Sequence, residues 1–111
     1  MRDDAEILRA AARRLEYLAG RTTAGDWRIG GLLATRPEVI ASRADGSTEH
    51  VAEARAGSAA WIAALSPAVA GPLAGWLRHA GERSPVEPEA LELARILLDR
   101  LPGTPAEWID I

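Results

Sequence analysis

The sequence contains no cysteine, lysine, asparagine, glutamine or phenylalanine. Without cysteine, disulfides, thiolate zinc sites and cysteine nucleophiles are all excluded. Without lysine, all 13 basic side chains are arginines. Most of the missing residues have AT-rich codons, whereas alanine, arginine, glycine and proline have GC-rich codons. We infer a GC-rich genome, such as that of an actinobacterium or one of its phages.

Long apolar runs and a positive charge balance are also missing. The chain opens on Met1-Arg2-Asp3-Asp4 rather than on the apolar run of a signal peptide. We expect no stretch to approach the ~20 apolar residues of a membrane-spanning helix, and therefore a cytoplasmic protein without a membrane partner. The formal net charge is −3, so a nucleic-acid partner is not expected either.

What is present fits one small folded domain. Of the 111 residues, 48% are hydrophobic, which is ordinary for a globular protein. We predict a single α+β domain over residues 1–103, followed by a tail, 104–111, that packs on the domain or on a partner. Much of the apolar fraction is alanine, which buries little area, so the core should be thin and the protein is expected to be a homo-oligomer.

The fold predicted from the residue pattern is an N-terminal helix, a three-stranded antiparallel sheet with a β-hairpin, and then three helices. Residues 4–19 have an acidic N-terminal cap, an apolar stripe at three- and four-residue spacing, and Gly20 as a stop. Residues 27–29 are predicted to be the first strand. Residues 39–43 and 49–53 flank an Asp-Gly turn and are predicted to be the hairpin.

Proline positions divide the second half of the chain into helices. A short apolar helix around residues 59–65 should end at Ser66-Pro67, which can begin the next helix. Pro72 is expected to make the first turn of that next helix irregular. Pro88 begins the last helix and Pro102-Gly103 ends it. The stripes place Trp61 and Trp76 in the predicted core.

Catalytic chemistry finds no support in the residue pattern. Strand alternation would place His50 and Ala52 on one face and the neighbouring Glu49 and Glu53 on the other, which argues against a local metal site or acid–base pair. His79 lies near a helix end, where its charge suits the helix dipole. No serine lies in a nucleophile elbow and no glycine run makes a phosphate loop. We predict a protein that is not an enzyme, with no metal and no cofactor.

Arginines offer one candidate binding site. Arg9 and Arg13 lie at helical spacing, and Arg21 and Arg28 follow closely in the sequence. If they converge, their guanidinium groups could bind a phosphorylated ligand or a nucleotide. The alternative is a solvated helix face whose arginines form ion pairs with glutamates of the same helix.

Aromatic residues offer a second candidate, a protein interface. Trp27 lies on the first predicted strand, and the tail contributes Trp108, Ile109 and Ile111. Tryptophan is over-represented at interface hot spots, so these residues are the predicted interface. The alternative for Trp108 is packing on its own chain or in a homodimer.

Two segments resemble a known family. Residues 22–27, Thr-Thr-Ala-Gly-Asp-Trp, resemble the Thr-Pro-Gly-Pro-Trp element of Ead-like small phage proteins and their actinobacterial relatives. Residues 59–68 resemble the alanine-rich segment of that family, in which an aromatic-isoleucine pair precedes Asn-Pro-Ala. Ala24 and Asp26 replace the usual prolines, Trp61 replaces a phenylalanine, and Ser66 replaces an asparagine.

The resemblance covers roughly residues 10–80 and implies a setting in a phage or mobile element, with no activity to transfer. The leading functional prediction is a non-enzymatic accessory protein that acts by protein binding, with a host-defence component as one candidate target. The alternative is a binder of a small phosphorylated ligand or nucleotide through the arginines.

Overall fold

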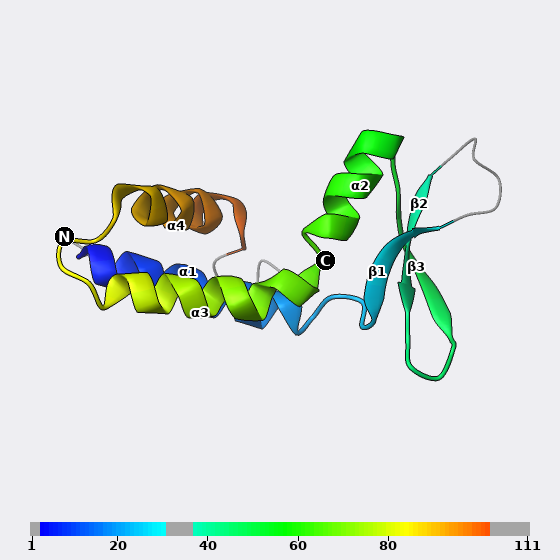
Figure 1. Ribbon diagram of the computed structural model, residues 1–111, viewed down its shortest axis with the longest axis horizontal. Helices are drawn as coiled ribbons and strands as arrows, with labels where there is room; N and C mark the ends of the chain where they lie inside the picture. Colours follow the sequence, from blue (N-terminus) through cyan, green and yellow to red (C-terminus); the bar gives the residue numbers. More distant parts are fainter. Residues whose placement is uncertain (1–2, 31–36, 103–111) are drawn as a thin grey trace. The chain divides into compact units, whose positions relative to one another are not determined.

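The computed structural model describes residues 3–30 and 37–102, and it confirms the predicted α+β class (Figure 1). Its elements form two compact units. One unit combines Met1–Arg21 with Ala70–Ile111 and is here called the three-helix unit. The other, Thr22–Val69, is here called the sheet unit. The prediction of one domain over residues 1–103 stays a prediction, since the compactness of each unit does not determine whether it folds alone.

Helix α1, Asp4–Ala19, begins and ends where the sequence predicts. The Asp3 side chain accepts a hydrogen bond of 2.7 Å from the backbone N–H of Glu6, which satisfies one of the free donors of the first turn. At the other end of the helix, the backbone N–H of Gly20 donates to the backbone oxygen of Glu16. Local capping therefore sets both limits of this helix.

Helices α3, Ala70–Gly81, and α4, Pro88–Arg100, complete the three-helix unit. Helix α1 contacts both of them, and α1 and α3 lie side by side (Figure 1). A Cβ built on Gly81 would lie 3.5 Å from the backbone oxygen of Ala5, so the end of α3 meets the start of α1 and the two helices are antiparallel. The buried side chains between the helices are mostly alanines: Leu8, Ala11, Ala12, Ala74, Leu77, Ala80, Ala90 and Ala94.

Strands β1, Asp26–Gly30, β2, Glu38–Ser42, and β3, Thr48–Glu53, form an antiparallel sheet in the order β1-β2-β3. The predicted hairpin between β2 and β3 is confirmed, and Gly46 in its turn has φ 87°. The Asp45 carboxylate accepts a hydrogen bond of 2.8 Å from the backbone N–H of Ser47. The Ser47 side chain, followed by this backbone bond, lowers the pKa of Asp45. An Asp-Gly pair was therefore a sound local signal for the turn.

The hairpin contains an irregularity that strand alternation did not predict. Ile40 pairs with His50 and Val39 pairs with Ala52, so the register shifts and Val51 is the extra residue. Since Val39 and Ile40 point to opposite faces, His50 and Ala52 do as well. The prediction that His50 and Ala52 share a face was wrong, because a bulge reverses the alternation.

Helix α2, Ala56–Ala64, lies against β1 and β2 within the sheet unit. The buried hydrophobic residues of the described part of this unit are Val39, Ala41 and Ala59, so Val39 is the largest apolar side chain fully enclosed there. A core this small supplies little stabilisation. The sheet unit therefore has an unusually thin core.

A 3₁₀ turn, η1, spans Pro67–Val69 and joins α2 to α3. The buried Ser66 hydroxyl accepts a hydrogen bond of 3.3 Å from the backbone N–H of Ala68. The expected irregular start of the third helix is therefore present, immediately before α3.

By length and composition alone, the stretch Ala56–Gly81 could cross a membrane. The prediction that no stretch of the sequence approaches this length was therefore wrong.

Candidate functional site

The two candidate arginines of α1, Arg9 and Arg13, interact with an acidic side chain of their own helix. Arg9 donates to the Glu6 carboxylate at 3.2 Å, and Arg13 donates to the same carboxylate at 2.9 Å. The bond from Arg13, supported by Arg9, lowers the pKa of Glu6. The structure thus brings these two arginines together on one carboxylate, in the way the ion-pair alternative describes.

The other two candidate arginines belong to different units. The Arg21 guanidinium lies 4.6 Å from the centre of the Tyr17 ring and donates to the Tyr17 hydroxyl. Arg28 donates to the Asp26 carboxylate at 2.8 Å, and that bond raises the pKa of Arg28. Each of the four arginines therefore has a partner close in sequence, and a bound phosphate would have to displace or share it.

Both histidines lie next to a carboxylate on exposed surfaces. His50 Nδ1 lies 2.7 Å from a Glu38 carboxylate oxygen across β2 and β3, and His79 Nδ1 lies 3.6 Å from Glu82. The His50 and Glu38 side chains are 55% and 30% exposed, so solvent reaches both members of the pair. Within residues 3–30 and 37–102, no three histidine or acidic side chains are grouped so that they could hold a metal ion.

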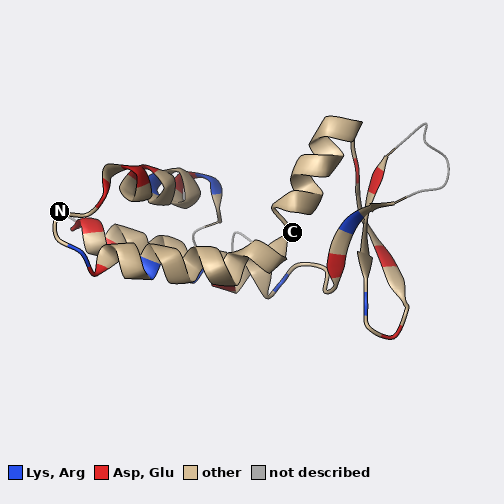
Figure 2. Cartoon of the chain, in the orientation of Figure 1, with Lys and Arg blue, Asp and Glu red and all other residues tan. Residues whose placement is uncertain are grey.

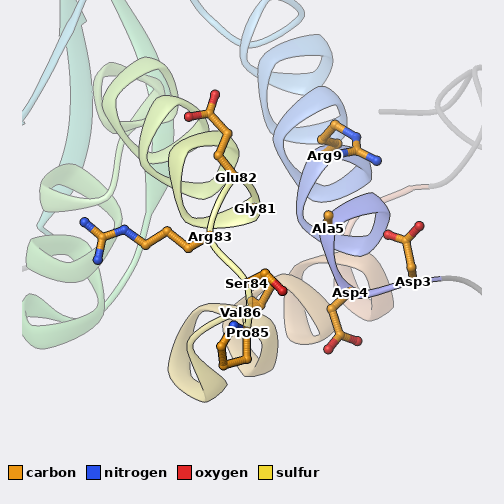
Figure 3. Close-up of a pocket in the computed structure, with 10 residues that line it drawn as sticks. All are labelled: Asp3, Asp4, Ala5, Arg9, Gly81, Glu82, Arg83, Ser84, Pro85 and Val86. Carbon is orange, nitrogen blue, oxygen red and sulfur yellow. The ribbon is translucent and has the colours of Figure 1, made fainter.

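One open depression of about 480 Å³ lies beside the start of α1, where the linker between α3 and α4 passes (Figure 3). Charged side chains at its rim, such as Asp4 and Arg83, point away from one another and not toward a common centre. Asp3 caps α1 and Arg9 binds Glu6, so these lining residues already have partners. The depression does not assemble a ligand-binding constellation.

The predicted interface residues fall into two groups. Trp27 is half-buried on β1, and its indole N–H donates to the backbone oxygen of Thr23 at 2.9 Å, which holds the ring against its own turn. Trp108, Ile109 and Ile111 lie outside the described residues. The role of all four in an interface stays a prediction.

Helix α2 has two apolar faces. One face lies toward β1 and β2, with Ala59 buried and Ile62 and Ala63 half-buried. The opposite face, here called the outer face of α2, is exposed and repeats at three- and four-residue spacing. Its members are Gly57, Ala60, Trp61, Ala64 and Leu65.

The outer face of α2 exposes large apolar side chains on a helix that contains no charged residue. Trp61 is 69% exposed and Leu65 is 53% exposed. No charged residue occurs in α2, which contrasts with the charges along α1 and α4 (Figure 2). Isolated exposed apolar residues are ordinary on a protein surface. A helix in which Ser58 is the one polar side chain, however, is normally covered over more than one face.

The prediction that Trp61 and Trp76 are core residues was wrong. Trp76, on α3, is 43% exposed. Both tryptophans are on apolar stripes, but in each helix alanines fill the face that packs inward: Ala59 in α2, and Ala70, Ala74 and Ala80 with Leu77 in α3. The available signal was the absence of any charge from position 56 to 77, which leaves no polar face for solvent.

Comparisons with protein-family models, curated proteins and solved structures gave no match to this chain. The resemblance to Ead-like phage proteins therefore remains a prediction from the two segments that suggest it.

Proposed function

We propose that this protein acts by binding another protein chain through the outer face of α2, and that it performs no chemistry of its own. The observation that supports the proposal is an uncharged surface helix that exposes Trp61 and Leu65. Full burial of one such side chain is worth roughly 1.5–3 kcal/mol, so covering two supplies a substantial part of a binding free energy. Tryptophan anchors of this kind dominate many protein interfaces.

The setting that we propose is a small accessory protein of a phage or mobile element. This part of the proposal rests on the two segments that resemble Ead-like proteins. A host-defence component is one candidate target. The phosphate-binding alternative has less support, because Arg9, Arg13, Arg21 and Arg28 all interact with nearby side chains.

A photo-crosslinking amino acid at position 61 tests the proposal directly. The matched control carries the same group at Ile96, which is 49% exposed on α4. Illumination in living cells should join position 61 to another polypeptide, and position 96 should give far less product. Peptide mapping of the product identifies the second chain.

Two outcomes would contradict the proposal. One is a folded protein whose position 61 forms no intermolecular product. The other is a product confined to a single polypeptide, which would mean that the chain covers its own helix.

A further inference from the structure

We infer that the partner of the outer face of α2 is a second copy of this chain, with the two α2 helices packed antiparallel about a two-fold axis. The inference rests on the proposed function and names its partner. It follows from the order of large and small residues along the outer face, from the absence of charge, and from the thin core of the sheet unit.

Large and small side chains alternate in a way that fits an antiparallel pair. If the axis passes between positions 62 and 63, Trp61 of one copy lies opposite Ala64 of the other. The same axis places Leu65 opposite Ala60, so each large side chain meets a small one. A parallel pair would place Trp61 against Trp61. The outer face is therefore self-complementary in shape in the antiparallel arrangement only, as a two-fold interface requires.

The electrostatics of the helix favour the same partner. A two-fold interface brings like residues close to one another, so any charge near the axis would be repelled by its own copy. Helix α2 has none (Figure 2). A partner with a charged rim would find no complementary charge on α2.

The small residues distinguish a protein helix from a lipid surface. Binding to a bilayer is stabilised in proportion to the apolar area that enters it and does not depend on shape. Gly57, Ala60 and Ala64 contribute little such area. Ala60 and Ala64, which lie near the axis, also allow two helix backbones to approach closely. The outer face is therefore better suited to a helix than to a membrane.

An exchange of the large and small residues tests the pairing. Trp61→Ala should leave two gaps in the homodimer, and Ala64→Trp should make tryptophans face one another. Each change should weaken self-association by at least about 30-fold, the effect of losing an interface hot spot. An equimolar mixture of the two variants should associate again, because in the mixed dimer every tryptophan faces an alanine.

Sedimentation velocity over a range of concentrations measures the dissociation constant in each case. Ile96→Ala, an exposed change on α4, is the control and should leave the constant unchanged. If Trp61→Ala does not fold, as judged by circular dichroism, the pair Leu65→Ala and Ala60→Trp makes the same exchange at the second contact.

Three results would overturn the inference. The first is a wild-type chain that stays monomeric up to about 100 μM. The second is an equimolar mixture of the Trp61→Ala and Ala64→Trp variants that does not recover association. The third is a monomer that instead binds phosphatidylcholine–phosphatidylglycerol vesicles through Trp61. If the chain is monomeric but position 61 still crosslinks to a different protein, the inference fails and the proposed function stands. If position 61 meets no other polypeptide, both fail.

Discussion

Among the described residues of the three-helix unit, Leu8 and Leu77 are the two largest side chains that are completely enclosed. Their buried neighbours are mostly alanines, which are too short to move into a space left by a missing side chain. We therefore expect Leu77→Ala to lower the free energy of unfolding by about 2–5 kcal/mol, the range for a leucine removed from a core. Denaturant titration followed by far-ultraviolet circular dichroism measures the change.

Ile96→Ala is the matched control for Leu77→Ala, because Ile96 is 49% exposed in the same unit. It should change the free energy of unfolding by no more than about 0.5 kcal/mol. Equal effects of the two substitutions would show that Leu77 is not part of a well-packed core.

Glu16 and Arg78 join α1 to α3 through a bidentate ion pair, one bond of which measures 2.7 Å. The bond from Arg78 lowers the pKa of Glu16 below its ordinary value of 4.5. A lowered carboxyl pKa adds stability that is fully present above pH 4.5 and disappears as the pH falls through the lowered value. We expect Arg78→Gln to lower the thermal midpoint at pH 7 by a small amount, and by less as the pH falls toward 3.

Thermal unfolding at a series of pH values from 7 to 3 checks this dependence. Glu92→Gln removes an exposed carboxylate of α4 and serves as the control. If the gap between Arg78→Gln and the wild type stays constant over the whole series, the ion pair does not contribute as described.

At the level of elements, two glycines of the sheet unit have backbone angles that other residues rarely adopt. Gly25 has φ 123° and Gly46 has φ 87°. A Cβ on Gly25 would also lie 2.8 Å from the Ser42 backbone oxygen, whereas a Cβ on Gly46 would meet nothing within 4 Å. We expect Gly46→Ala to cost about 1–2 kcal/mol for the backbone alone, and Gly25→Ala to cost more.

The control substitution for these glycines should change the stability in the opposite direction. Gly75 lies in α3, where an added Cβ would meet nothing within 4 Å, so Gly75→Ala should stabilise the protein by roughly 0.5–1 kcal/mol. Chemical denaturation of the three variants should rank them Gly75→Ala, Gly46→Ala and Gly25→Ala in falling stability. Any other order would contradict the geometry.

The elements whose limits depend on neighbouring residues could be predicted from the sequence. Helix α1 was predicted over 4–19 because an aspartate cap, an apolar stripe and a glycine stop all lie within the segment. The hairpin was predicted from its Asp-Gly turn. The position of the bulge could not be predicted, since it depends on which residue of β2 faces which residue of β3.

The candidate site was less predictable than the fold. A period of 3.6 residues shows that a helix has an apolar stripe, but it does not show which side of a wholly apolar helix packs inward. In α2 the small residue Ala59 is buried and the large residue Trp61 is exposed, which reverses the usual expectation. The arginines were predicted as a possible cluster from their closeness in sequence, whereas their pairing depends on which carboxylate each one reaches.

At the level of the whole molecule, the sheet unit is inserted between the first two helices of the three-helix unit. Because α1 and α3 are antiparallel neighbours, the end of α1 and the start of α3 lie at the same end of that unit (Figure 1). We expect residues 1–21 joined to residues 70–111 by a short glycine-serine linker to fold as a helical protein, since helix hairpins need only a few linking residues.

Circular dichroism and a cooperative thermal transition would confirm that the shortened chain folds. Leu77→Ala in the same chain should lower its midpoint, as in the full-length protein. A shortened chain without a cooperative transition would mean that the three-helix unit depends on the sheet unit.

The insertion also sets an order of events during synthesis. Helix α1 leaves the ribosome first, but its main partner, α3, is translated only after the whole of Thr22–Val69. The strands and α2 contact one another over short sequence separations, so they can fold before α1 has a partner helix to pack against. The contacts of α1 with α3 and α4 are therefore the last to form, and a translational pause before Ala70 would prolong the exposure of Leu8 to chaperones.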